Sequence, residues 1–221
     1  MPRPLDRATG ERMELPAYYA DFQENYARTR NFWKLERGQF FAEPGDESWE
    51  AFDRGEWEEA MRLLESRRPD LASYIGEHAA RGTISRRIRI VRLPPSPYLL
   101  WELRLLKIRD ESGGPIRVLL DHDIAGLEDQ GSLPEIYTMD DNVMYQAIYD
   151  DKGVLEHALR YTDKALVARC RDFIADLFLR GEPIGEFFWR EIAHLPPARP
   201  SRQAIPLDYL RRAGRPQPIR S

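Results

Sequence analysis

The chain has 221 residues, of which 42% are hydrophobic and 32% are charged, and its formal net charge is −4. A chain of this size and composition can bury a core, which excludes wholesale disorder. No apolar run approaches the roughly 20 residues of a membrane helix, so we expect no membrane span. The acidic balance argues against a nucleic-acid binder built on bulk charge.

The N-terminus has no apolar segment of the kind found in secretory signals, and the chain has one cysteine, Cys170. A single thiol excludes an internal disulfide and suits a reducing compartment, so we expect a cytoplasmic protein. Cys170 falls on the apolar stripe of a predicted helix, together with Leu166 and Ile174. This position is typical of a core residue rather than a nucleophile.

Composition divides the chain into three parts. We predict a flexible N-terminus at residues 1–14, a single α+β domain at residues 15–193 and a basic, proline-rich tail at residues 194–221. The tail has six prolines and six arginines against one acidic residue, Asp208. Prolines prevent a long helix or an inner strand there. The tail is predicted to be a solvated or extended arm, and the alternative is an arm that contacts a partner or RNA.

Hydrophobic periodicity predicts the elements of the domain. Helices are predicted at residues 16–30, 57–64, 71–80, 98–108, 163–180 and 183–192. Ser96 and Asp163 are placed to cap two of them. Strands are predicted at residues 31–41, 86–93, 115–120, 135–139, 143–149 and 154–161. Asp-rich turns join the last three strands, which predicts an antiparallel meander in a mixed sheet packed by amphipathic helices.

Several familiar chemistries have no motif in this sequence. It contains no phosphate-binding glycine loop, no GxGxxG after a strand, no GxSxG and no HxKxxxxD. We therefore predict no cofactor. Asp121, His122 and Asp123 follow a predicted strand and offer ligands for a divalent cation, but such residues are common in solvated turns. We interpret them as a turn and predict no metal site.

Two arginines form the most informative pattern. Arg87 and Arg89 lie on one face of a predicted strand, and Ile88 and Ile90 lie on the other. Two guanidinium groups on one face can clamp a carboxylate or a phosphate. The alternative is a structural face in which an acid such as Glu102 pairs with one of them, because a buried arginine needs a partner.

Aromatic residues follow this strand. Tyr98 and Trp101 offer flat surfaces for stacking beside the arginines. The remaining tryptophans lie among apolar positions and are predicted in the core; these are Trp33, Trp49, Trp57 and Trp189.

The runs at residues 87–94 and 96–103, together with FWKLE at 32–36 and EIYTMDD at 135–141, resemble a family. This is an actinobacterial family catalogued as a domain of unknown function, whose members are often encoded near helix-turn-helix regulators. The resemblance spans roughly residues 20–190. Pro97, Glu135 and the basic tail depart from its pattern. The resemblance implies a fold plan and a bacterial cytoplasm rather than a reaction.

Three functions remain open at this point. The first is a binding or regulatory protein that holds an anionic small molecule, or an acidic segment of a partner, against Arg87, Arg89, Tyr98 and Trp101. The second is a tailoring enzyme of a biosynthetic pathway, with Glu102 or Asp121 as general base and His122 as acid–base partner. The third is RNA contact through the tail. The sequence does not determine the oligomeric state.

Overall fold

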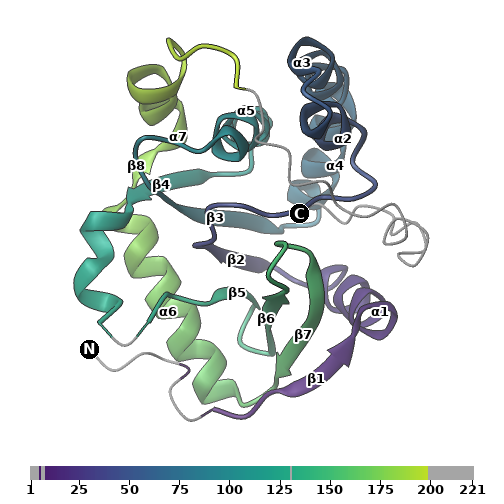
Figure 1. Ribbon diagram of the computed structural model, residues 1–221. Coiled ribbons are helices and arrows are strands. Elements are labelled where there is room, and N and C mark those ends of the chain that lie inside the picture. The colour runs from purple at the N-terminus through teal and green to yellow at the C-terminus, as the bar shows by residue number, and fades with distance from the viewer. Residues whose placement is uncertain (1–4, 6–7, 130, 199–221) are drawn as a thin grey trace.

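The computed structural model describes residue 5, residues 8–129 and residues 131–198, and these form an α+β fold (Figure 1). The strands are β1 Glu11–Glu14, β2 Asn31–Glu36, β3 Ile84–Val91, β4 Ile116–Leu120, β5 Glu135–Met139, β6 Val143–Tyr149, β7 Leu155–Tyr161 and β8 Glu182–Pro183. The helices are α1 Leu15–Tyr26, α2 Glu47–Asp53, α3 Trp57–Ser66, α4 Arg68–Ala80, α5 Pro97–Glu111, α6 Lys164–Arg180 and α7 Ile184–Phe187. A 3-10 segment spans Asp121–Leu127, and a π-helical turn spans Phe188–Ile192.

One mixed sheet of eight strands runs through the molecule in the order β1-β7-β6-β5-β2-β3-β4-β8. Strands β2, β3 and β4 are parallel, and helices connect them in sequence. Strand β5 pairs antiparallel with β2 and begins the meander β5-β6-β7. The short strands β1 and β8 pair antiparallel at the two edges. The three parallel strands therefore end on the same side of the sheet, next to the start of α5.

Helices cover both faces of the sheet (Figure 1). On one face, α6 packs its apolar stripe, which includes Cys170 and Ile174, against Ile88 and Ile90 of β3. On the other face, α1 covers the meander, and α5 and α7 pack against β3 and β4. Helices α2 and α3 pack on α5 and form a further apolar cluster around Trp49. Residues that alternate along β3 are thus divided between two cores, as expected for a strand buried on both faces.

The predicted fold class is confirmed: an α+β domain with a mixed sheet and a C-terminal meander. Both predicted caps are also present. The Ser96 side chain accepts a hydrogen bond from the backbone N–H of Leu99, and Asp163 accepts from Ala165 and Leu166. No described helix combines the length and apolar character needed to cross a bilayer.

The structure differs from the sequence prediction at several places. Residues 11–14 were predicted as part of a loose terminus but form β1, because the edge of β7 offers unpaired backbone groups. The strand predicted at 31–41 ends at Glu36, and the following aromatic residues belong to a loop. Trp189 was predicted in the core, but 68% of its surface is exposed. That prediction is wrong, because α7 and the π-helical turn that follows it place Phe188, rather than Trp189, toward the core. Residues 199–221 of the predicted tail lie outside the described residues.

Candidate functional site

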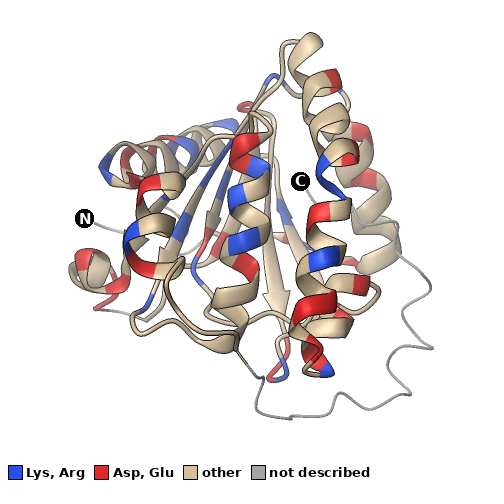
Figure 2. Ribbon diagram, turned by 90° about the horizontal axis from the view of Figure 1, so that it is seen from above, with Lys and Arg blue, Asp and Glu red and all other residues tan. Residues whose placement is uncertain are grey.

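Charged side chains gather between the sheet and α5, where a core would ordinarily be apolar. We call this group the charged cluster; its members are Lys34 and Glu36 of β2, Arg87 and Arg89 of β3, Glu102 of α5 and Glu135 of β5. Figure 2 shows blue segments on strands that lie between the helices. Register explains the grouping, because β2 and β3 are neighbours in which Lys34 lies beside Arg87 and Glu36 lies beside Arg89.

Glu36 connects the two strands of the charged cluster. Its Oε1 lies 2.7 Å from Lys34 Nζ, and its Oε2 accepts a hydrogen bond from Arg87 Nη1 at 2.9 Å. Burial alone would raise the pKa of Glu36, but the positive charges of Arg87 and Lys34 outweigh it and hold the pKa at about 2. Glu36 is therefore ionised at neutral pH.

Arg89 pairs with Glu102 at the deepest point of the charged cluster. Arg89 Nε donates to Glu102 Oε2 at 2.8 Å, and Nη2 lies 2.7 Å from the same oxygen. Arg89 Nη1 also donates to the backbone carbonyls of Glu36 and Ile90. The hydroxyl of Tyr98, one helical turn before Glu102, donates to the other carboxylate oxygen at 3.1 Å. Burial raises the pKa of Glu102, and Arg89 opposes that shift.

Glu135 is a carboxylate that sequence reasoning noted but did not select as a site residue. Its Oε1 accepts hydrogen bonds from the backbone N–H groups of Arg37, at 2.7 Å, and Gly38. Burial raises the pKa of Glu135 to about 7, although Arg89 acts in the opposite direction. A carboxyl that titrates near neutral pH inside a charged group is typical of functional sites. The signal in the sequence was the single acid at the start of a meander strand, which is too common to be selective.

Exposure falls steadily across the charged cluster. The exposed fractions of the side chains are 20% for Lys34, 11% for Arg87 and 0% for Arg89. Arg109 of α5 is also buried, and burial together with the charge of Arg87 lowers its pKa to about 10. Solvent therefore reaches the charged cluster at the Lys34–Arg87 end, where three positive side chains lie near one another.

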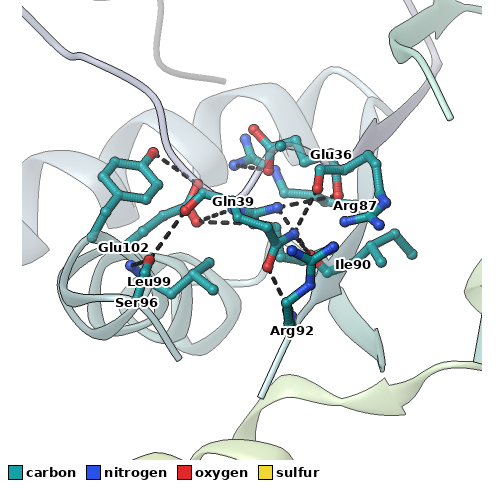
Figure 3. Close-up of polar contacts among 12 residues, drawn as sticks. Glu36, Gln39, Arg87, Ile90, Arg92, Ser96, Leu99 and Glu102 are labelled. Carbon is teal, nitrogen blue, oxygen red and sulfur yellow. Dashed lines mark hydrogen bonds and ion pairs between the residues drawn. The ribbon is translucent and has the colours of Figure 1, made fainter. Parts of the chain in front are cut away.

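The loop after β2 holds the carboxyl ends of β2 and β3 to the start of α5 (Figure 3). The Gln39 amide nitrogen donates to the backbone carbonyl of Ile90 at 2.9 Å, and its oxygen accepts from the backbone N–H of Arg92 at 2.8 Å. The Ser96 hydroxyl donates to the Gln39 carbonyl at 3.1 Å. The Gln39 side chain thus holds this loop in place, and the loop carries the backbone N–H groups of Arg37 and Gly38 that donate to Glu135.

The structure brings the predicted clamp residues together with Glu102. Arg87 and Arg89 share a strand face, as predicted, and Tyr98 contacts Glu102. Trp101 lies apart from the arginines in the apolar cluster of α2 and α3, where its indole N–H donates to the Ser48 hydroxyl at 2.9 Å. Arg89 and Trp101 have no exposed surface. A direct role for them in ligand binding stays a prediction.

The three residues predicted for acid–base chemistry have separate partners. Glu102 is paired with Arg89, whereas Asp121 accepts a hydrogen bond from Arg92 Nε at 2.6 Å. The His122 side chain is 72% exposed and lies 3.5 Å from Asp123. Within the described ranges, no group of three His, Cys, Asp or Glu residues is arranged to hold a metal ion. The catalytic role of these residues is untested and stays a prediction.

Comparison with known proteins adds the family. The sequence model of DUF6879, described as a domain of unknown function, matches residues 20–189. The chain belongs to this family. The DUF6879 match covers the charged cluster and nearly the same span as the resemblance seen in the sequence. The actinobacterial origin and the neighbouring regulators implied there stay predictions.

Two further comparisons of this chain, with curated proteins and with solved structures, do not indicate a function. No curated protein matches this chain. Among solved structures, TrmBL2, described as an archaeal chromatin protein with a novel mode of DNA binding, matches with 10% sequence identity and a TM-score of 0.43. That match covers 80% of this chain, and it spans about half, 54%, of the TrmBL2 chain. A likeness of this size supports no statement about function.

Proposed function

We propose that the chain is a binding protein for an anionic small molecule, with its site at the Lys34–Arg87 end of the charged cluster. The observation that carries this proposal is the pair of cations on neighbouring strands. Lys34 and Arg87 lie side by side in register, both contact Glu36, and both keep some exposed surface. Like charges at this spacing repel each other, and burial adds to the cost. Glu36 supplies one negative charge to these two cations, and a bound anion would supply a second.

The exposed fractions indicate the kind of ligand. With 20% and 11% of the side chains exposed, Lys34 and Arg87 offer enough surface to contact one carboxylate or phosphate group and too little for a broad macromolecular surface. Arginine suits such planar or tetrahedral anions because its donors form a fixed fork. An acidic side chain from a partner protein carries the same chemistry, and the experiment below distinguishes a free anion from an acidic peptide.

The proposal is tested by binding measurements. Thermal unfolding is followed with inorganic phosphate, citrate and a library of acidic metabolites, since a ligand that binds the native state raises the midpoint. The affinity of each hit is then measured by calorimetry for Lys34→Gln, for Arg87→Gln and for the control Arg62→Gln, an exposed arginine paired with Glu59 on α3. We expect the first two variants to lose about tenfold or more in affinity.

Two results would overturn the binding proposal. One is a library in which no anion shifts the midpoint; the other is a hit whose affinity is equal in Lys34→Gln, Arg87→Gln and the control. If only acidic peptides bind, and do so through Lys34 and Arg87, the partner-segment form of the proposal replaces the small-molecule form.

A second candidate function is an enzyme, and one observation favours it. Glu135, whose pKa is about 7, lies in the charged cluster near Arg89 and Glu36, and a group with such a pKa can take up and release protons at neutral pH. In this form, Glu135 is the acid–base group and Lys34 and Arg87 hold the anionic part of the substrate. Conversion of a bound anion that is lost in Glu135→Gln, while binding is kept, would distinguish the enzyme from the binding protein. RNA contact through the tail involves residues outside those described and stays a prediction.

A further inference from the structure

A second positively charged surface lies on the opposite face of the sheet. Consecutive residues of a strand point to opposite faces, so Trp33 and Arg86 face α6 where Lys34 and Arg87 face α5. We call this the arginine–aromatic surface; its members are Trp33 of β2, Arg86 of β3, Arg117 of β4 and Phe178 of α6. It is therefore separate from the charged cluster.

Ring and guanidinium contacts connect these four side chains in a row. The guanidinium carbon of Arg86 lies 4.7 Å from the centre of the Trp33 ring, and the Trp33 ring meets Phe178 edge-on at 5.6 Å between centroids. The guanidinium carbon of Arg117 lies 5.2 Å from the centre of the Phe178 ring. All four side chains are half-buried, so each still presents part of its surface to solvent.

The arginines of this surface contact rings and backbone carbonyls rather than acids of the described residues. Among the described residues, no carboxylate forms an ion pair with Arg86 or Arg117. Burial lowers the pKa of Arg86, and no nearby acid counteracts that shift. Arg117 donates to the backbone carbonyls of Phe178, Leu179 and Gly181 at the end of α6. Most arginines of the described residues do pair with acids; the exposed Arg54 and Arg62, for example, pair with neighbouring glutamates.

An exposed apolar side chain lies beside the row. Ile84 lies two residues before Arg86 on the same face of β3 and is 44% exposed. Tryptophan, arginine and exposed aliphatic residues together are typical of binding hot spots rather than of ordinary surface. A partner must supply both negative charge and apolar side chains to match this combination.

We propose that the arginine–aromatic surface binds a segment of a partner protein in which acidic and large apolar side chains occur together. Charge complementarity selects the acidic residues, because Arg86 and Arg117 offer guanidinium groups that no acid of the described chain occupies. Ile84 and the rings of Trp33 and Phe178 receive the apolar side chains. A nucleic acid fits less well, since two arginines neutralise few phosphates and the chain as a whole carries a charge of −4.

Fluorescence anisotropy with short labelled peptides tests this proposal. The probe alternates glutamate with leucine; one comparison peptide replaces leucine by serine, another replaces glutamate by lysine, and a single-stranded DNA oligonucleotide is the fourth probe. We expect the glutamate–leucine peptide to bind and the other three to bind at least about tenfold more weakly. Arg86→Gln and Ile84→Ser should each weaken binding of the first peptide, whereas Arg62→Gln should leave it unchanged.

Ile84 provides a variant that tests the surface with little effect on the fold, because 44% of this residue is exposed. Thermal unfolding of every variant confirms that it is native before binding is measured. The proposal is overturned if the glutamate–leucine peptide does not bind, if Arg86→Gln and Ile84→Ser bind it as the wild type does, or if the oligonucleotide binds more tightly than the peptide and depends on Arg86. Since Arg86 does not contribute to the charged cluster, this result is independent of the anion site.

Discussion

Arg89 Nη2 lies 2.7 Å from Glu102 Oε2, and neither side chain is more than 5% exposed. This ion pair joins β3, the middle of the three parallel strands, to α5. A buried pair of this kind gains little over an apolar pair of the same size, but breaking it leaves one charge buried without compensation. The two residues are therefore expected to be strongly coupled.

Glu102→Ala is predicted to destabilise the protein by about 3–5 kcal/mol, because Arg89 then remains charged in the interior. The double substitution Arg89→Met with Glu102→Leu is predicted to cost clearly less than Glu102→Ala alone, since no charge is left unpaired. Urea unfolding of the single variants Arg89→Met and Glu102→Leu and of the double variant measures the coupling. Independent, additive effects would show that the pair does not hold α5 to the sheet.

Glu135 gives a prediction about pH. Its pKa is about 7 in the folded protein, above the usual value of 4.5, so the folded state binds a proton more tightly than the unfolded state. The corresponding contribution to stability is complete below pH 4.5 and is lost as the pH rises through 7. Burial and the neighbouring Glu36 cause this shift, and its full size corresponds to about 3 kcal/mol at most.

Glu135→Gln should remove this loss, because the amide oxygen can still accept from the N–H groups of Arg37 and Gly38 without carrying a charge. The measurement is the unfolding free energy between pH 5 and pH 8 for both proteins. Glu36 shifts in the other direction, with a pKa of about 2, so its contribution is lost as the pH falls from 4.5 toward 2. If the wild type instead gained stability from pH 5 to pH 8 relative to Glu135→Gln, that result would contradict a raised pKa for Glu135.

Gln39 should be sensitive to small chemical changes. Its amide donates to the Ile90 carbonyl and accepts from the Arg92 N–H, so both polar ends are used. Gln39→Glu keeps the acceptor but loses the donor, and it is predicted to cost about 1–3 kcal/mol, as is Gln39→Ala. Thermal unfolding measures the cost. Gln23→Ala, on α1, is the control for a glutamine with no such side-chain bridge. An equal loss of stability in Gln39→Ala and Gln23→Ala would refute the role of Gln39.

The sequence predicted those features that depend on local pattern. Alternation along β3 placed Arg87 and Arg89 on one face correctly, and the capping residues Ser96 and Asp163 marked the starts of α5 and α6. The turns between β5, β6 and β7 were evident because Asp and Gly favour them. The possible pairing of Glu102 with an arginine was also weighed from the sequence alone.

The sequence did not reveal features that depend on contacts between distant segments. Lys34 and Glu36 join Arg87 only because β2 pairs with β3 across about fifty residues of chain, so the three could not be grouped in advance. Likewise, the pKa of Glu135 follows from burial and from the backbone N–H groups of the loop after β2. Strand β8 has only two residues, and its pairing with β4 leaves no periodic signal.

The cap of α5 gives a last prediction that connects the sequence to the site. The Ser96 hydroxyl accepts from the Leu99 N–H and lies within 3.1 Å of the Gln39 carbonyl, so it serves both the helix start and the loop that reaches Glu135. Ser96→Ala should destabilise the protein by about 1 kcal/mol, whereas Ser96→Asp should keep the cap but lose the donor to Gln39.

Hydrogen exchange at the Leu99 and Gly38 amides separates the two effects. We expect Ser96→Ala to speed exchange at both amides and Ser96→Asp to speed it mainly at Gly38; protection of Gly38 unchanged in both variants would show that α5 and the loop are held independently.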